Sequence, residues 1–273
     1  MGGHARGRAA APVTRRDILS AAVACCALGA TSSVQLVSPP AVPDNDYDPT
    51  TTPEDRVHAD PRAISLAATT RRYVAVTFDD GPDPEYTPAV LAILRRYAVT
   101  ATFFVVGSNA TAHPDLIARI RSQGHVLANH TQNHRWLNEL SQAEVTAELT
   151  LGARHVQGGP GAGLYRPPRG WTSPTVATVA DRLAIRPVFW SDCLEAHLAL
   201  GPRGAGQRVG NDAGPGSIIL THDGGTIVGP NPQRIDRSHS VASLPYLLQT
   251  LAKRSLTPVS VPTLLASSNR ARR

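Results

Sequence analysis

From residue 71 to residue 266, short apolar runs alternate with longer segments whose apolar positions recur with the period of an α-helix. This alternation is typical of parallel βα units. The predicted strands are residues 73–78, 101–106, 125–129, 164–166, 186–190, 217–221 and 258–261. The predicted helices are residues 86–97, 112–123, 141–157, 173–183 and 240–253. Seven strands are too few for the eight-stranded barrel of about 250 residues, so the pattern predicts an α/β fold, an incomplete (β/α) barrel of about seven parallel strands.

Two segments precede this domain and a short one follows it. Residues 1–30 contain Arg15 and Arg16 ahead of a 13-residue uncharged run from Ile18 to Ala30. This segment resembles a twin-arginine export signal, and an N-terminal helix of the fold is the alternative. The run is shorter than the ~20 residues that cross a membrane as a helix. We therefore expect an exported protein, secreted or at the cell surface, with no stable membrane span once the signal is removed. Residues 31–70 predict a Pro-, Asp- and Thr-rich linker, and residues 267–273 form a basic tail.

The net charge of +6 lies at the two ends of the chain. Residues 1–30 carry +3 and the tail carries +3, so the body between them is neutral. A neutral body offers no obvious electrostatic footprint for a phosphate backbone, and we expect no nucleic-acid partner. Cys25 and Cys26 lie in the signal-like segment, and Cys193 alone would remain after cleavage. No disulfide is therefore expected within the mature chain.

Polar pairs follow two of the predicted strands. Asp79 and Asp80 come after residues 73–78, and His130 and His134 come after residues 125–129. Neighbouring carboxylates need a cation to relieve their repulsion, and one can bind a metal while the other acts as a base. Histidines at i and i+4 lie on one face of a helical turn, where both imidazoles reach one ion. Either pair alone is also compatible with an ordinary turn. Together they predict a metal site with one open coordination position.

Two more strand ends carry Arg166 and His222. Pro167 and Pro168 stiffen the backbone after Arg166 and fix where its side chain points, although a rigid surface turn has the same pattern. His222 follows the strand 217–221 and is able to donate a proton near neutral pH.

Taken in order, these four segments resemble the signature motifs of the NodB-like polysaccharide deacetylases. The segments are TFDDGP (77–82), HTQNH (130–134), RPPRG (166–170) and LTHD (220–223), and the resemblance covers residues 71–266. It implies a distorted (β/α) barrel and a hydrolase that acts on carbon–nitrogen bonds other than peptide bonds. The implied activity is metal-dependent removal of acetyl groups from carbohydrate polymers, so the implied partner is an acetylated polysaccharide.

The resemblance also implies a role for each motif residue. Asp79 would be the general base that takes a proton from the attacking water, and Arg166 would hold that carboxylate ionised and aimed. His222 would protonate the leaving amine. One divalent metal ion, zinc, would be bound by Asp80, His130 and His134.

The residues implied to bind substrate are Arg169, Trp190 and Leu220. The backbone N–H of Arg169 would stabilise the oxyanion, and Leu220 would line the acetyl pocket. The sequence departs from the family at position 169, which is Arg where Tyr or Phe is common. This change replaces an aromatic wall beside the sugar with a cation and puts the substrate preference in doubt.

A second departure follows Trp190. The family usually has two aspartates and a Trp here, and Cys193 stands at the expected Asp position. A carboxylate is expected near His222 to keep that imidazole protonated. Asp192 and Glu195 are the acidic candidates in this segment, and strand alternation places Asp192 on the same face as Trp190. The sequence therefore favours Asp192.

The leading hypothesis is an exported zinc-dependent deacetylase that hydrolyses N-acetyl groups of a polymer containing N-acetylglucosamine. Peptidoglycan is the first-choice substrate, and chitin or chitooligosaccharide is the second. One alternative is an O-acetyl ester deacetylase such as an acetylxylan esterase. The altered residues 190–197 motivate another, a carbohydrate-binding family member with weak activity. The sequence indicates nothing about the oligomeric state.

Overall fold

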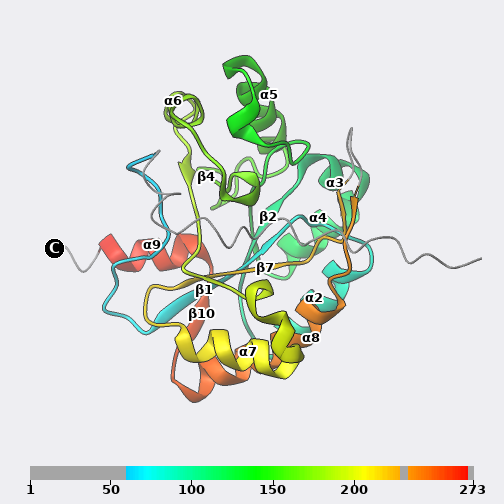
Figure 1. The fold of residues 1–273 in the computed structure, drawn as a ribbon, viewed down its shortest axis with the longest axis vertical. Coiled ribbons are helices and arrows are strands. Elements are labelled where there is room, and N and C mark those ends of the chain that lie inside the picture. Colours follow the sequence, from blue (N-terminus) through cyan, green and yellow to red (C-terminus); the bar gives the residue numbers. More distant parts are fainter. Residues whose placement is uncertain (1–59, 228–232, 270–273) are drawn as a thin grey trace, which may run out of the picture. The chain divides into compact units, whose positions relative to one another are not determined.

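The computed structural model describes residues 60–227 and 233–269 (Figure 1). The predicted export signal, residues 31–59 of the predicted linker and residues 270–273 of the basic tail lie outside this part of the chain. No helix within the described residues is long and apolar enough to cross a membrane.

One sheet of parallel strands forms the centre of the domain (Figure 1). Its strand order is β5-β4-β3-β2-β1-β7-β6, and β10 pairs with the first half of β1. All residues of β2, β3 and β7 are buried, as expected for strands covered on both faces. The strands are β1 (Tyr73–Asp79), β2 (Thr102–Val105), β3 (Val126–Asn129), β4 (Leu164–Tyr165), β5 (Arg186–Pro187), β6 (Asp192–Cys193), β7 (Ile218–His222) and β10 (Thr257–Val259). A separate antiparallel pair joins β8 (Thr226–Ile227) to β9 (Gln233–Arg234).

The sheet curls into an incomplete barrel. Strands β5 and β6 stand at opposite ends of the strand order, yet only four residues separate them in sequence. That connection spans at most about 18 Å, so the two edges must approach each other. Ile64 lies at this junction, where it bridges to Val188 and its carbonyl accepts a hydrogen bond from the Phe189 N–H at 2.8 Å. The predicted distorted, incomplete (β/α) barrel is confirmed.

Residues 60–67, which the sequence pattern places in the linker, contact the barrel. Ile64 and Ala67 are buried, and Leu66 bridges to Ser217 at the start of β7. The apolar side chains of this polar segment cover apolar surface of the barrel. They are too few to show a helix or strand period in the sequence.

Five helices match the predictions closely: α2 (Tyr86–Arg96), α4 (Pro114–Ser122), α5 (Gln142–Ala153), α6 (Pro174–Arg182) and α8 (Ser238–Lys253). Helix α5 begins with a capping box, in which Ser141 and Glu144 each accept from the other's backbone N–H. The predictions missed α3 (Gly107–Ala112), α7 (Gly201–Asp212) and α9 (Val261–Asn269). Three 3₁₀ turns complete the described elements: η1 (Leu137–Glu139), η2 (Pro168–Gly170) and η3 (Glu195–Leu200).

Helix α7 contains four glycines, which lower its intrinsic helix propensity. The sequence pattern therefore did not predict a helix here. The structure gives a packing reason for one of them. A Cβ at Gly206 would lie 2.5 Å from the backbone oxygen of Ser243 in α8. The glycine therefore permits the close contact of α7 with α8, which lie side by side (Figure 1).

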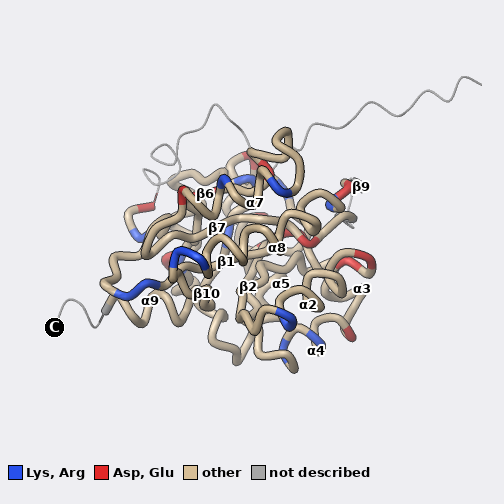
Figure 2. Tube along the Cα trace, turned by 90° about the horizontal axis from the view of Figure 1, so that it is seen from below, with Lys and Arg blue, Asp and Glu red and all other residues tan. Residues whose placement is uncertain are grey.

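Charged residues lie on several different elements around the described domain (Figure 2). Asp79, Asp80 and Arg166 are instead buried, at the carboxyl ends of the central strands.

Candidate active site

Strands β1 and β7 place two of the predicted catalytic residues opposite each other. Asp79 ends β1, His222 ends β7, and the two are register partners in this parallel pair. Neighbouring strands lie about 4.8 Å apart, so the predicted base and the predicted acid flank one small space. The residues after β3 and β4 reach the same end of the sheet.

Asp80, His130 and His134 form a buried cluster there. One ligand atom from each residue lies within 4.8 Å of the others. The Asp80 Oδ1 atom is 3.2 Å from His134 Nε2 and 3.5 Å from His130 Nε2. The three residues predicted as metal ligands are therefore brought together.

The chemistry of this cluster fits a divalent cation. His130 Nδ1 lies 2.9 Å from the Arg166 carbonyl and can only donate to it, so its Nε2 carries the lone pair that faces Asp80. Asp80 Oδ1 is buried and accepts no hydrogen bond from the described residues. Asp80 Oδ2 is held by Arg237 Nη2 at 2.9 Å, which leaves Oδ1 to bind an ion. A cation between these lone pairs removes their repulsion. Arg237 is a functional residue that sequence reasoning missed, because it lies 157 positions from Asp80 in no recognisable motif.

The histidines do not lie on a helical turn, so that part of the prediction is wrong. Thr131 and His134 have φ values of 70° and 53°, and the segment is a loop. Its backbone is held by the buried Glu148, whose Oε2 accepts from the N–H groups of Gln132 at 3.1 Å and Asn133 at 2.8 Å. The two imidazoles still converge, with ring centroids 5.0 Å apart, because positive φ turns the chain back on itself.

Arg166 positions Asp79. Its Nη1 is 2.6 Å from Asp79 Oδ1 and 2.9 Å from Thr77 Oγ1, while Nε and Nη2 donate to the carbonyls of Val188 and Phe189. The guanidinium is fully buried, and burial lowers the pKa of Arg166 while the Asp79 charge opposes that shift. A side chain with this many fixed hydrogen bonds holds one orientation, as the two prolines after it suggest.

Glu195, rather than Asp192, is the carboxylate beside His222. Glu195 Oε1 lies 3.2 Å from His222 Nδ1 and accepts from the His222 N–H at 3.1 Å. Burial acts to raise the pKa of Glu195, but the charge and hydrogen bond of His222, with Arg237, outweigh it and lower the pKa to about 2. Asp192 accepts from the Ser191 hydroxyl at 2.8 Å, and burial raises its pKa. The preference for Asp192 was wrong because β6 contains only Asp192 and Cys193, so strand alternation does not extend back to Trp190. It is Cys193 that shares an apolar cluster with Trp190.

The carboxylate next in sequence to His222 is committed elsewhere. Asp223 Oδ2 accepts a hydrogen bond from Thr87 Oγ1 at 2.5 Å. Burial and the charges of Asp80, Asp83 and Asp79 raise the pKa of Asp223 to about 7.

The three predicted substrate-binding residues lie beside this centre. Trp190 and Leu220 are buried in one apolar cluster, and the Arg166 guanidinium lies 5.6 Å from the centroid of the Trp190 ring. Arg169 has a φ of 58° and lies over the indole of Trp136. Their contacts with substrate remain predictions.

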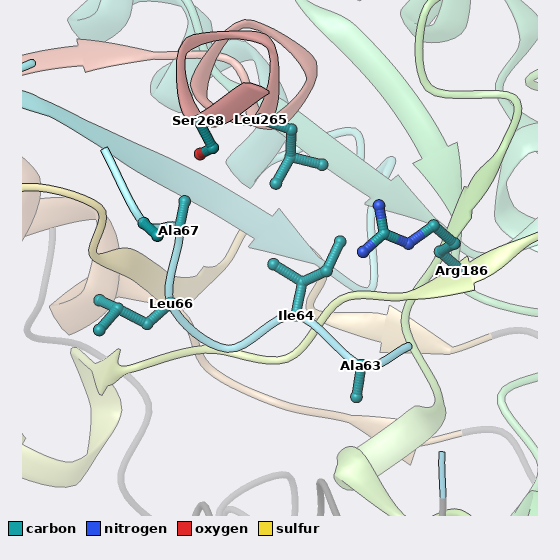
Figure 3. Close-up of a pocket in the computed structure, with 8 residues that line it drawn as sticks. Ala63, Ile64, Leu66, Ala67, Arg186, Leu265 and Ser268 are labelled. Atoms are coloured by element: carbon teal, nitrogen blue, oxygen red, sulfur yellow. The ribbon is translucent and has the colours of Figure 1, made fainter. Parts of the chain in front are cut away.

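A groove with a volume of about 280 Å³ lies elsewhere in the domain (Figure 3). It is lined by Ala63, Ile64, Leu66, Ala67, Ala68, Arg186, Leu265 and Ser268. None of the predicted site residues lines it, so it is separate from the cluster at the strand ends.

Comparisons with known proteins agree with this geometry. The sequence profile described as "Polysaccharide deacetylase" matches residues 67–188. A peptidoglycan-N-acetylglucosamine deacetylase of Bacillus cereus is 34% identical over 197 residues, which cover 71% of this chain and 88% of the relative. A chitooligosaccharide deacetylase of Bradyrhizobium is 35% identical over 202 residues, covering 71% of this chain and 90% of the relative.

Solved structures agree as well. The structure of a peptidoglycan N-acetylglucosamine deacetylase superposes with a TM-score of 0.66 at 27% identity, covering 75% of this chain and 93% of that one. A family 4 carbohydrate esterase from Streptomyces lividans in complex with acetate gives a TM-score of 0.59 at 28% identity, covering 68% of this chain and 91% of that one. The chain therefore belongs to the polysaccharide deacetylase family, and the predicted enzyme class is confirmed.

Proposed function

We propose that this chain is an exported deacetylase that hydrolyses N-acetyl groups of a glycan containing N-acetylglucosamine. Peptidoglycan is the first substrate and chitooligosaccharide the second, in line with the names of the relatives. The observation that carries the proposal is the convergence of three units at one end of the sheet. They are the Asp79–Arg166 pair, the His222–Glu195 pair and the cluster of Asp80, His130 and His134.

A divalent ion, zinc in our proposal, would be held by Asp80, His130 and His134. When bound, it would polarise the acetyl carbonyl and make water more acidic. Arg237 would hold Asp80 oriented toward that ion through its 2.9 Å contact. The Arg166 carbonyl would fix the tautomer of His130 in the same way.

Asp79 takes the proton of the attacking water in this proposal. Its Oδ1 is occupied by Arg166 at 2.6 Å, so Oδ2 is the oxygen that accepts the proton. The ion pair with Arg166 prevents rotation of the carboxylate. Water then attacks the acetyl carbon, and the backbone N–H of Arg169 donates to the oxyanion that forms.

His222 supplies the proton that the leaving nitrogen needs. An amine leaves poorly unless it is protonated, so amide cleavage requires a charged acid close to the base. Glu195 stays ionised because its pKa is about 2, and its negative charge favours the imidazolium form of His222. An ester oxygen demands less protonation, so the His222–Glu195 pair favours N-deacetylation over hydrolysis of an O-acetyl ester.

Export through the twin-arginine route is part of the proposal. It rests on Arg15 and Arg16 ahead of the 13-residue uncharged run. An enzyme that acts on cell-wall glycans must meet them outside the cytoplasm.

Acetate release by the purified chain tests the proposed activity. The substrates are peptidoglycan, chitooligosaccharides and acetylated xylan, each with added zinc and with the chelated enzyme, and Asp79→Asn is the control. We expect acetate from the first two substrates, only with zinc and only from the parent chain. Release from xylan alone would assign ester hydrolysis, and release from none would leave a binding protein.

A further inference from the structure

Exposed arginines gather where three helices of the domain end, and the chemistry above does not use them. They are Arg95 and Arg96 of α2, Arg119 and Arg121 of α4, and Arg154, which follows α5. We call these five residues the basic face. None of them forms an ion pair with a carboxylate of the described residues. Exposed arginines elsewhere do, as in the pairs of Arg208 with Asp212 and of Arg234 with Glu85.

The three helix ends are neighbours in space. A hollow of about 290 Å³ is lined by Arg95 from the end of α2 and by His125, which follows α4. A second hollow of about 400 Å³ is lined by His125, Arg121 and residues 156–160. Arg121 Nη2 also donates to the His155 carbonyl at 2.5 Å, which joins α4 to the segment after α5. Figure 2 shows blue segments beside one another at α2 and α4.

The basic face lies at the opposite end of the sheet from the site. His125 directly precedes β3, and His130 directly follows it. A strand of four residues spans about 13 Å. A ligand on the basic face would therefore leave the strand ends that carry Asp79 and His222 open.

His125 adds an N–H group to the two hollows. Its Nδ1 accepts a hydrogen bond from the Ala101 N–H, so Nε2 carries the proton of the neutral ring. Within the described part of the chain, no group accepts a hydrogen bond from Nε2, although the side chain is only 7% exposed. Buried donors normally have an acceptor. This one indicates an acceptor from outside the chain.

The local charge is strongly positive. Residues 93–101, 118–128 and 150–163 contain the five arginines and no aspartate or glutamate. The helix dipole favours a cation in the last turn of a helix, but it does not explain why every carboxylate is missing. Guanidinium groups bind phosphate oxygens through two parallel hydrogen bonds, which makes phosphate a good match for a surface of arginines.

The same segments carry no apolar anchor for a membrane. The large apolar residues exposed among the described residues are Leu66, Trp136 and Leu200, and none of them belongs to these segments. Proteins that lie on a bilayer insert such side chains between the lipids. The basic face therefore fits a ligand in solution better than it fits a bilayer.

We propose that the basic face binds a linear, phosphate-bearing polymer of the cell envelope. One phosphate would occupy the hollow beside Arg121 and His125, and the neighbouring phosphates would pair with the other arginines. A single small ion does not reach arginines on three elements, whereas a chain of phosphates does. The proposal goes beyond deacetylation and rests on the proposed export only for the location of the polymer. The bound polymer would hold the domain while the opposite end of the sheet meets the glycan.

Calorimetric binding of long-chain inorganic polyphosphate to the full chain, at several salt concentrations, tests this surface. Each phosphate contact that is lost lowers the slope of log K against log salt by about one. Arg119→Gln combined with Arg121→Gln should therefore lower the slope by about two and weaken binding about ten-fold or more. Arg203→Gln combined with Arg208→Gln removes the same charge from α7 and should keep the parent's slope. Arginines at the two ends of the chain contribute equally to both variants.

A measurement on the unmodified chain guards against a variant that fails to fold. Phenylglyoxal modifies accessible guanidinium groups, and mass spectrometry locates the modified residues. Polyphosphate should protect Arg119 and Arg121, whereas Arg203 and Arg208 should react as before. Equal loss of binding in the two double variants, or no protection in the parent, overturns the basic face.

Two further probes test the class of ligand. Equally tight binding of inorganic monophosphate would overturn the polymer in favour of a single anion. Binding to vesicles of anionic phospholipid without binding to polyphosphate would overturn it in favour of a membrane surface. None of these measurements uses acetate release, so failure of the proposed deacetylase activity and failure of the basic face are separate results.

Discussion

A buried histidine far from the catalytic centre makes the stability of this domain depend on pH. His125 is 7% exposed, and its Nδ1 accepts a hydrogen bond from the Ala101 N–H at 3.2 Å, where β2 is about to begin. Its ring also packs edge-on against Phe103. A nitrogen that accepts a backbone hydrogen bond must be unprotonated, and burial lowers the pKa of His125 from 6.5 to about 4.

The sign follows from linkage. In the unfolded chain His125 binds a proton below pH 6.5, whereas in the folded chain it binds one only below about pH 4. The stabilising contribution is therefore complete above pH 6.5 and is lost as the pH falls toward 4. With 1.36 kcal/mol per unit of pKa, the loss is about 2 kcal/mol between pH 7 and pH 5 and about 3 kcal/mol below pH 4. For a domain of this size, 2 kcal/mol corresponds to about 4–8 °C in Tm.

The perturbation that tests this is His125→Asn. Asparagine places an oxygen near the position of Nδ1, so it keeps the acceptor for Ala101 and cannot titrate. The free energy of unfolding, measured with urea at pH 7 and at pH 5, should fall by about 2 kcal/mol less in the variant than in the parent. Exposed His239, changed to Asn, is the control and should keep the parent's pH dependence. Parallel loss of stability in the parent and His125→Asn would refute the argument.

Further outcomes follow from the active site and the N-terminal segment. Glu195→Gln should move the alkaline limb of the pH–activity profile to lower pH, because the negative charge that favours protonated His222 is lost. Asp192→Asn is the control and should leave the limb in place. A shift in Asp192→Asn alone would show that Asp192, and not Glu195, is the carboxylate that acts on His222. Asp79→Asn should lower kcat by ~10²-fold or more while metal analysis finds unchanged stoichiometry. His134→Ala should abolish metal binding, and full stoichiometry in that variant would contradict the ligand set. Lysines at positions 15 and 16 should retain the precursor in the cytoplasm on fractionation, and normal export would indicate the general secretion route.

The sequence predicted the central sheet well because buried parallel strands are short apolar runs with distinct ends. The ends of β1, β3 and β7 also carried the residues that the structure brings together. Elements stabilised by a neighbour were missed. Helix α7 carries glycines that fit against α8, and residues 60–67 form backbone hydrogen bonds with Pro187, Phe189 and Gly216. In both cases the element that provides the contact is remote in sequence, so a prediction from a few neighbouring residues does not include it.

The supporting contacts of the site were missed for the same physical reason. Arg237 contacts Asp80, and Glu148 holds the backbone of the loop of residues 130–134, each from another part of the chain. Both are buried charges, and a buried charge destabilises the folded state unless it is paired. Once their partners are known, these two residues therefore mark the site. In the sequence alone, a lone arginine or glutamate on a helix or loop has no such partner and looks like a solvated surface residue.

The segment after Trp190 shows why a departure from a motif need not remove its chemistry. Cys193 occupies the position where the family has an aspartate, and a thiol is a poor source of negative charge. The carboxylate arrives two residues later, because the chain turns from β6 into η3 and the longer side chain of Glu195 reaches His222. Cys193 Sγ remains in contact with it, 3.7 Å from Glu195 Oε2. The requirement imposed by an imidazolium is a negative charge at about 3 Å, and this chain meets it from a different backbone position. The altered residues 190–197 therefore give no reason to expect a binding protein without activity.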